Sequence, residues 1–384
     1  MANELNHPAR AHFLEMPAGR VFLNSAYMSR KPKVAIESLH ETVDRLACPD
    51  FAVEEFFEPL ERVRARLARL VGGTSERMSL TGSASYGTAT LAWNLRTRAQ
   101  DLVGTRRRIL GVDGQFPSNV QTWQHLEPFG FQLELVDAGP GATDRLIESL
   151  DTDVALLAIE PLSWTDGLRL DVPRLHKAAR EAGALTLTDV TQSMGVDEPL
   201  PDTVDFDVVV GGGYKWLLGP YGTGFMRLSS ELQEKLEPLE WNWKNFEGAS
   251  DFNRLTEYQT AFASPAAKFD HGESSAFMRM AAWEKSLAVL EEITPAAIAA
   301  HTKAFGQTLA ARMDRDRFTL SEIESNQQAT HLFRLAPRDP ADFDALSERL
   351  ASQGLEVSRR AGGIRISPHV YNDMSHLDAL VAAL

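Results

Sequence analysis

A lysine set among glycines is the feature that most constrains this chain. Lys215 lies within Gly-Gly-Gly-Tyr-Lys-Trp-Leu-Leu-Gly-Pro-Tyr-Gly-Thr-Gly-Phe, residues 211–225. A β-type run, Phe206–Val210, precedes this segment, and Pro220 and the glycines after the lysine favour turns. A lysine just past the end of a buried strand has its amine in a cleft rather than in bulk water. The pattern therefore predicts a buried lysine at the edge of a sheet.

The order of β-type and helical patterns predicts the fold class. Between about residues 77 and 228, short β-type runs alternate with helical stretches such as Val172–Ala182, which has Pro173 at its start and Gly183 at its end. This alternation is typical of an α/β fold with a mostly parallel sheet covered by helices. Ligands bind beyond the carboxyl ends of the strands in such sheets. The predicted strands are residues 108–112, 131–136, 154–159, 184–188 and 206–210.

The length of 384 residues favours two domains. After about residue 250 the pattern changes, and we expect a large domain over residues 20–255 and a small α+β domain over residues 256–384. The N-terminal arm, residues 1–19, is expected to pack with the small domain. The elements predicted there are helices over 275–292 and 295–313, a strand over 330–335, a helix over 341–353, a strand over 363–367 and a final helix from Ser375.

Charge and composition exclude several functional classes. The net charge of −14 argues against a nucleic-acid partner or an anionic membrane surface. No apolar run approaches the roughly 20 residues of a membrane helix, and the first residues show no secretory signal. The single cysteine, Cys48, excludes an intrachain disulfide, and the ten histidines show no metal-ligand spacing. We expect a cytoplasmic protein without a metal site.

A strand-end aspartate complements the lysine. Asp189 follows the apolar run 184–188, and the pattern places it at the same sheet edge as Lys215. An isolated carboxylate there is often a helix cap. Together, however, a buried lysine and an aspartate are the two groups that pyridoxal 5′-phosphate (PLP) needs, because the amine forms a Schiff base and the carboxylate pairs with the pyridinium nitrogen. Gln192, three residues on, is placed to hydrogen-bond the ring hydroxyl.

A hydroxyl-rich segment, Leu80–Thr90, leads into a helical stretch and suits a phosphate. Backbone N–H groups at a helix N-terminus attract anions, and the helix dipole adds to this attraction. A capping turn rich in Ser and Thr is the alternative reading. We expect Ser85 to contact the cofactor's phosphate, with Ala84 in the same site.

Two aromatic residues and one arginine complete the candidate site. Phe116 follows the run ending near Val112 and is expected to stack on PLP, although a core phenylalanine is the alternative. Tyr214 is placed to reach the phosphate through its hydroxyl, unless it only packs. Arg365 sits mid-strand between apolar neighbours and suits a substrate α-carboxylate. A structural salt bridge or an exposed strand face is the alternative for the arginine.

Together these residues resemble the class V aminotransferase family of fold-type I PLP enzymes, which includes cysteine desulfurases, selenocysteine lyases, kynureninases and isopenicillin N epimerase-like proteins. The resemblance runs from Val21–Tyr27 to Arg365–Asn372 and is most specific in Tyr214–Gly222. It implies a seven-stranded type of sheet, an amino acid as substrate, and a homodimer with active sites near the subunit interface. It also implies the roles given above for the cofactor contacts and for Arg365. Within the first matching segment, Asn24 and Tyr27 are expected to contact substrate.

Departures from the family pattern narrow the reaction. Desulfurases carry a persulfide cysteine shortly before the carboxylate-binding arginine, whereas this chain has Ser358–Gly363 there and its only cysteine is Cys48. Desulfurases have histidines where this chain has Phe116 and Tyr214, which look more like kynureninase.

A second departure concerns the neighbouring subunit. Many relatives place Gly-Thr near residue 272 to reach that subunit's phosphate, but this chain has Gly272-Glu-Ser-Ser275. The cross-subunit contact at Glu273 and Ser274 is therefore open, with Ser274 as the substitute.

The resemblance implies that Lys215 removes the substrate's Cα proton. Our first choice of reaction is cleavage at Cβ, as in a C–S type lyase that works without a persulfide cysteine. An aminotransferase is the second choice, followed by an epimerase or a kynureninase-like hydrolase. Loops 163–166 and 241–243 are expected to set the substrate. A non-catalytic binding protein that kept the fold is the alternative from another class.

Overall fold

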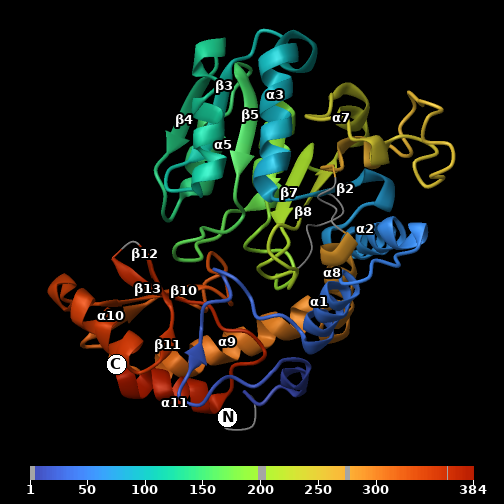
Figure 1. Ribbon diagram of the computed structural model, residues 1–384. Coiled ribbons are helices and arrows are strands. Elements are labelled where there is room, and N and C mark those ends of the chain that lie inside the picture. Colours follow the sequence, from blue (N-terminus) through green and yellow to red (C-terminus); the bar gives the residue numbers. More distant parts are fainter. Residues whose placement is uncertain (1–4, 198–204, 273–276, 361) are drawn as a thin grey trace.

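The computed structural model describes residues 5–197, 205–272, 277–360 and 362–384, and its largest element is a seven-stranded sheet (Figure 1). The strand order is β2-β8-β7-β6-β5-β3-β4. Strands β3 to β7 pair in parallel, whereas β8 runs antiparallel to both of its neighbours. The strands are β2 (Met78–Thr81), β3 (Arg108–Val112), β4 (Gln132–Val136), β5 (Val154–Ile159), β6 (Leu185–Asp189), β7 (Val208–Gly212) and β8 (Gly224–Leu228). The predicted α/β fold class is confirmed.

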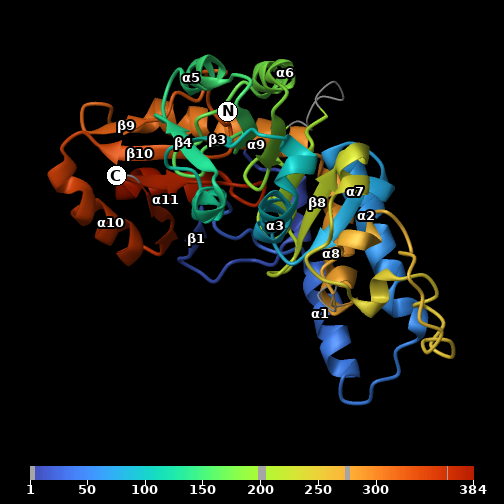
Figure 2. The same cartoon turned by 90° about the horizontal axis from the view of Figure 1, so that it is seen from above.

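Helices cover both faces of this sheet. Figure 2 shows α3 (Ala84–Val103) on one side and α5 (Ala142–Ser149) with α6 (Val172–Ala182) on the other. In β7, Val208 and Val210 pack in the cluster that contains α3, while Val209 packs in the cluster on the opposite face. Burial of both faces explains why the central strands are continuous apolar runs rather than alternating ones.

The C-terminal part forms a second sheet, which is antiparallel and has the order β12-β13-β10-β9. Its strands are β9 (Phe318–Leu320), β10 (Phe333–Pro337), β12 (Ser358–Arg360) and β13 (Gly363–Ile366). The helices of this part are α9 (Pro295–Arg312), α10 (Phe343–Ser352) and α11 (Met374–Ala383). Near the N-terminus, β1 (Val21–Phe22) pairs in parallel with β11 (Leu355–Glu356), and Leu5 lies in the same apolar cluster as β10 and β13.

A segment after β1 connects the two sheets. The backbone N–H of Ser25 donates to the carbonyl of Ser367, 3.0 Å away, and the Ser25 hydroxyl lies 2.6 Å from that of Tyr371. Further along, the Lys31 amine donates to the carbonyl of Tyr214 at 2.7 Å. Residues 24–31, called the strap below, therefore join the C-terminal sheet to the loop after β7.

The remaining helices lie beside the sheet, where α1 (Lys33–Arg45) and α2 (Glu58–Val71) pack against α8 (Phe277–Ile293). Two short helices, α4 (Gln121–Gln124) and α7 (Ser230–Lys235), complete the set. No helix in the described part of the chain is long and apolar enough to cross a membrane.

Most of the predicted helices and strands begin and end within two residues of the observed ones, and the differences have local causes. The predicted strand 206–210 begins at Val208, because Asp207 instead accepts hydrogen bonds from the backbone and hydroxyl of Thr186. Residues 330–332 were predicted as strand but precede β10, because His331 turns to the carbonyl of Gln192, 2.8 Å away. The first residues of the predicted helix 275–292 lie outside the described residues.

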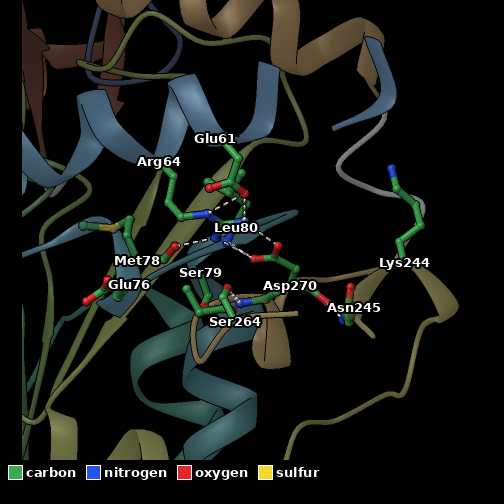
Figure 3. Close-up of polar contacts among 12 residues, drawn as sticks. Glu61, Arg64, Glu76, Met78, Ser79, Leu80, Lys244, Asn245, Ser264 and Asp270 are labelled. Carbon is green, nitrogen blue, oxygen red and sulfur yellow. Dashed lines mark hydrogen bonds and ion pairs between the residues drawn. The ribbon is translucent and has the colours of Figure 1, made fainter. Parts of the chain in front are cut away.

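A buried ion pair fixes the edge of the sheet that leads into α3. In Figure 3, Arg64 of α2 faces Asp270, with nitrogen–oxygen distances of 3.0 and 2.7 Å. Asp270 also accepts a hydrogen bond from the backbone of Leu80 in β2 at 2.7 Å. Both side chains are almost completely buried. The pair therefore holds β2 in place just before the start of α3.

Replacing Arg64 with alanine is expected to destabilise the protein by about 3–5 kcal/mol, because Asp270 would remain buried without a counter-charge. The matched control is Arg62→Ala on the same helix, which removes an exposed pair with Glu58 and is expected to change the free energy of unfolding by less than about 1 kcal/mol. Urea unfolding measures both. Equal effects of the two substitutions would show that the Arg64 pair does not have this role.

Candidate active site

Seven residues predicted to contact a cofactor line one cavity at the carboxyl ends of β5, β6 and β7. A larger hollow of about 660 Å³, around Arg169 and Asp197, contains none of them. The residues lining the first cavity are Ser83, Ala84, Ser85, Phe116, Ser118, Glu160, Trp164, Asp189, Thr191, Gln192, Gly212, Tyr214 and Lys215. The fold therefore brings together segments that are far apart in the sequence.

Lys215 lies three residues beyond β7 in a tightly packed loop. The Gly213 N–H donates to the carbonyl of Thr223 at 2.8 Å. A Cβ atom at Gly213 would approach the Thr223 hydroxyl to 2.5 Å and the Trp283 ring to 2.6 Å, so only glycine fits there. The Lys31 amine of the strap holds the next carbonyl, that of Tyr214. This packing sets the direction from which the Lys215 side chain enters the cavity.

The pKa of Lys215 is lowered to about 8, mainly by burial; the charges of Asp189 and Glu160 oppose this lowering, and those of Arg365 and Arg360 add to it. The amine is 5.5 Å from the ring centre of Phe116 and 5.7 Å from that of Tyr214. No described carboxylate forms an ion pair with it. An amine with this pKa holds a proton less tightly than an ordinary lysine and suits proton transfer near neutral pH.

Asp189 ends β6 and has a fixed orientation. One carboxylate oxygen accepts a hydrogen bond from the backbone N–H of Thr191 at 2.9 Å and another from its hydroxyl. The second oxygen accepts from the Asn119 amide at 2.9 Å. The Thr191 hydroxyl in turn accepts from the N–H of Gly212 at 2.9 Å, which links the ends of β6 and β7.

Glu160 is a site residue that the sequence reasoning missed. It directly follows β5, and one of its oxygens accepts from the N–H of Phe116 at 2.6 Å and from the Asn119 amide at 2.8 Å. Asn119 thus donates to the carboxyl groups of both Glu160 and Asp189. Burial, and next the charge of Asp189, raise the pKa of Glu160 to about 8. A glutamate at the end of an apolar six-residue run was the available signal, because a buried carboxylate needs special partners.

The start of α3 fits a phosphate group. Ser83 caps the helix by accepting from the N–H of Tyr86 at 3.3 Å, and the first N–H groups of a helix have no partner within it. The Ser85 hydroxyl lies beside this end and donates to Ser118 at 2.8 Å. Ala84 lines the same wall. Backbone donors, hydroxyls and the helix dipole form a combination that attracts an anion.

Aromatic and amide groups form the walls around Lys215. The rings of Phe116 and Trp164 meet edge to face with centres 5.5 Å apart. Tyr214 packs against Tyr221 with ring centres 4.8 Å apart. The Gln192 amide donates to the carbonyl of Ala26 at 3.1 Å and accepts from the Trp216 indole at 3.0 Å. Because a primary amide has two N–H groups, one remains for a ligand.

Arg365 lies in β13 behind Trp164, with only 1% of its surface exposed. Its guanidinium donates to the carbonyl of Trp164 at 2.7 Å and lies 3.5 Å from the amide oxygen of Asn24. No described carboxylate forms an ion pair with it, so the two alternative readings, an exposed strand face and a salt bridge, do not hold within the described chain. Tyr27 is 57% exposed, and neither Tyr27, Asn24 nor Arg365 lines the cavity itself.

The structure separates the two loops that were expected to set the substrate. Trp164 lines the cavity, whereas Trp241 and Trp243 line an open hollow that contains none of the cavity residues. Glu273 and Ser274, the expected cross-subunit phosphate contacts, lie outside the described residues.

Comparisons with known proteins identify the family of this chain. The family model "Aminotransferase class-V" matches residues 21–380, and the chain belongs to this family. It is a PLP-dependent enzyme of fold type I, and the predicted cofactor is confirmed.

Relatives in the family have different activities. A probable cysteine desulfurase from Methanothermobacter thermautotrophicus is 29% identical over 47% of this chain, but the alignment spans only 44% of that protein. Isopenicillin N epimerase from Streptomyces clavuligerus is 25% identical, with 95% of this chain and 94% of the relative covered. A kynureninase from Burkholderia mallei is 26% identical over 62% of this chain and 58% of its own length.

Solved structures show the same fold at lower identity. The cystine C–S lyase C-DES, in complex with its reaction product cysteine persulfide, is 18% identical with a TM-score of 0.82, covering 95% of this chain and 97% of that chain. The cysteine desulfurase CsdA from Escherichia coli is 19% identical with a TM-score of 0.81, covering 97% and 96%. These similarities establish the architecture and leave the reaction to other evidence.

The raised pKa of Glu160 predicts that the wild-type protein and Glu160→Gln differ in stability by an amount that depends on pH. The folded state keeps the Glu160 proton between its ordinary pKa of 4.5 and about 8, whereas the unfolded state releases it. Stability from this group is therefore lost as pH rises through that window. Glu160→Gln should gain at least about 1 kcal/mol relative to the wild-type protein between pH 5 and pH 8.

Urea unfolding of the cofactor-free proteins at the two pH values measures this gain. Glu348→Gln, which changes an exposed glutamate of α10, is the control and should show no such gain. A constant difference between Glu160→Gln and wild type across the pH range would contradict a neutral Glu160.

Proposed function

We propose that this enzyme cleaves a bond at Cβ of an amino acid, as a C–S type lyase without a persulfide cysteine. The observation that carries the proposal is the buried amine of Lys215, which shares one cavity with every group expected to hold PLP. The proposed mechanism needs a lysine that exchanges protons near neutral pH, and the low pKa of Lys215 supplies this property.

The residues of the cavity fit PLP in one arrangement. Lys215 is the residue that would carry the cofactor, and Asp189 would pair with its pyridine nitrogen. The start of α3, with Ser85, would hold the phosphate, and Phe116 would cover one face of the ring. When bound, PLP withdraws electrons from the substrate's Cα and weakens the bonds around it.

The chain's own groups then orient the substrate and move its proton. Arg365 holds the α-carboxylate, because its fork of N–H donors matches a carboxylate and no described acid occupies it. The Lys215 amine accepts the proton from Cα. The Cβ–S bond then breaks, with the electron pair leaving on sulfur as a thiolate. Water hydrolyses the released enamine to a keto acid and ammonia.

Lack of a cysteine near Arg365 supports a lyase over a sulfur-transferring desulfurase. Ser358–Gly363 contains none, and Cys48 is exposed at the end of α1, outside the cavity-lining set. A sulfur product would therefore leave without being captured by a protein thiol. One structural neighbour is a cystine C–S lyase, which is consistent with this choice.

Epimerisation is a second candidate, favoured by one observation. The alignment with isopenicillin N epimerase covers nearly the whole of both chains, whereas those with the probable cysteine desulfurase and the kynureninase cover 44–62% of either chain. An epimerase would return the proton to Cα from the opposite face and release no ammonia. An aminotransferase would instead hand the amino group to a keto acid.

We also propose a homodimer. Large aromatic side chains gather on the segment after α7, where Trp241, Phe252 and Tyr258 are 67%, 44% and 88% exposed. Large exposed apolar patches mark sites of contact with other proteins. A second copy of the chain is the partner that the family resemblance implies.

Replacing Lys215 with alanine is expected to abolish the visible absorbance of covalently attached cofactor and to reduce turnover by at least about 10³-fold, because the proton-transferring amine is lost. Borohydride reduction and peptide mapping should place PLP on Lys215. The control is Lys177→Ala, which removes an exposed lysine of α6 outside the cavity and should leave the label in place. A label on any other lysine would overturn the assignment.

Product analysis with cysteine, cystine, kynurenine and alanine distinguishes the reactions. The lyase proposal predicts pyruvate and ammonia from a sulfur amino acid. Racemised substrate without ammonia would instead identify an epimerase. Conversion that stops until a keto acid is added would identify an aminotransferase.

A further inference from the structure

Two arginines flank Trp164 in the wall of the cavity. Arg365 donates to the Trp164 carbonyl at 2.7 Å, and the guanidinium carbon of Arg360 lies 5.1 Å from the centre of the Trp164 ring. Arg360 ends β12, which pairs antiparallel with β13, where Arg365 lies. Trp164 itself lines the cavity, so both guanidinium groups contact a lining residue, although neither arginine lines the cavity itself.

Neither guanidinium has an acidic partner in the described chain. Arg360 donates to the carbonyl of Arg359 at 2.6 Å, and the Nε atoms of both Arg360 and Arg365 are buried without a hydrogen-bond partner. Burial, and next the charge of Arg360, lower the pKa of Arg365, so the two cations act on each other. Arg365 is buried and Arg360 is partly buried, and like charges held in this way without a counter-ion are unfavourable and are stabilised when an anion binds.

The residue next to Arg360 in the sequence does have an acidic partner. Arg359 lies beside Arg360 in the same strand but forms an ion pair with Asp344 on α10. The whole chain carries a net charge of −14, so acidic side chains outnumber basic ones overall. Around the cavity, burial and the charge of Asp189 raise the pKa of Glu160, and Asp189 is engaged by Asn119 and Thr191. Neither carboxyl group forms an ion pair with Arg360 or Arg365.

The single α-carboxylate of an amino acid substrate would pair with only one of these two arginines. The proposed function assigns it to Arg365, which is deeper in the structure and held by Trp164 and Asn24. Arg360 is partly exposed and reaches the other side of Trp164, over its ring. A planar guanidinium in this position matches a second carboxylate that extends from the substrate's side chain.

We propose that Arg360 binds a carboxylate on the substrate's side chain, so that the enzyme selects amino acids with two carboxylates over neutral ones. The inference rests on the proposed binding of an amino acid beside Lys215 and Arg365. It does not depend on which bond of that amino acid is broken.

The experiment compares two ligands that differ in one charge. S-carboxymethylcysteine carries the second carboxylate, and S-carbamoylmethylcysteine is its neutral amide of nearly equal size. Cleavage of the first at Cβ consumes one water and yields thioglycolate, pyruvate and ammonia. Dissociation constants come from the change in visible absorbance of the holoenzyme, and pyruvate release gives kcat/KM. Aspartate and asparagine form a second pair for binding alone.

The wild-type enzyme should bind the carboxylate member of each pair about 10- to 100-fold more tightly. Arg360→Gln should remove this preference while changing the affinity for the amide member by less than about twofold. Arg359→Gln, the matched control on the same strand, should keep the wild-type preference.

Three results would overturn the inference. These are equal binding of both members by the wild-type enzyme, equal loss of both members in Arg360→Gln, and loss of the preference in Arg359→Gln. Because binding is read separately from cleavage, tight binding of S-carboxymethylcysteine without pyruvate release would reject the lyase proposal and leave the charge preference supported. A holoenzyme whose absorbance responds to none of the four compounds would overturn both.

Discussion

Desolvation of the Lys215 amine is the constraint on which the rest of the site depends. A buried ammonium is costly, so the fold must either supply a counter-charge or let the proton leave easily. Here Asp189 supplies part of a counter-charge without an ion pair, while Arg365 and Arg360 oppose the protonated form. The surrounding loop is built from glycines because Trp283 and Thr223 leave no space for a side chain at Gly213. Packing and electrostatics thus favour the same outcome, an amine that readily gives up its proton.

The cavity contains two carboxyl groups, those of Glu160 and Asp189, which share the Asn119 amide as a hydrogen-bond donor but differ in their other partners. Asn119 donates to both and each is 7% exposed, but Asp189 receives further hydrogen bonds from Thr191, whereas Glu160 receives its other one from the backbone of Phe116. Burial, and next the charge of Asp189, raise the pKa of Glu160, which favours its protonated form. A neutral Glu160 still supports the backbone of Phe116, whose ring forms the adjacent wall.

Much of the fold and part of the site were readable from the sequence, for physical reasons that differ between residues. Strand ends and glycine turns have local signatures, so the helix 172–182 and the edge positions of Asp189 and Lys215 followed from pattern alone. The domain boundaries and the individual site roles stay predictions. Glu160, Asn119 and Lys31 escaped because their partners come from distant segments that only tertiary packing brings together. Trp164 lies in a loop that was predicted to set the substrate, but its position between two arginines depends on β12 and β13.

The strap of residues 24–31 links the C-terminal sheet to the loop that carries Lys215. One end is hydrogen-bonded to Ser367 beside β13, and the other holds the carbonyl of Tyr214 next to the reactive lysine. Arg365 lies in β13, the strand next to the first of these hydrogen bonds. Displacing the C-terminal sheet would therefore move the backbone at Lys215 unless these hydrogen bonds break, which couples the position of Arg365 to that of the Lys215 amine.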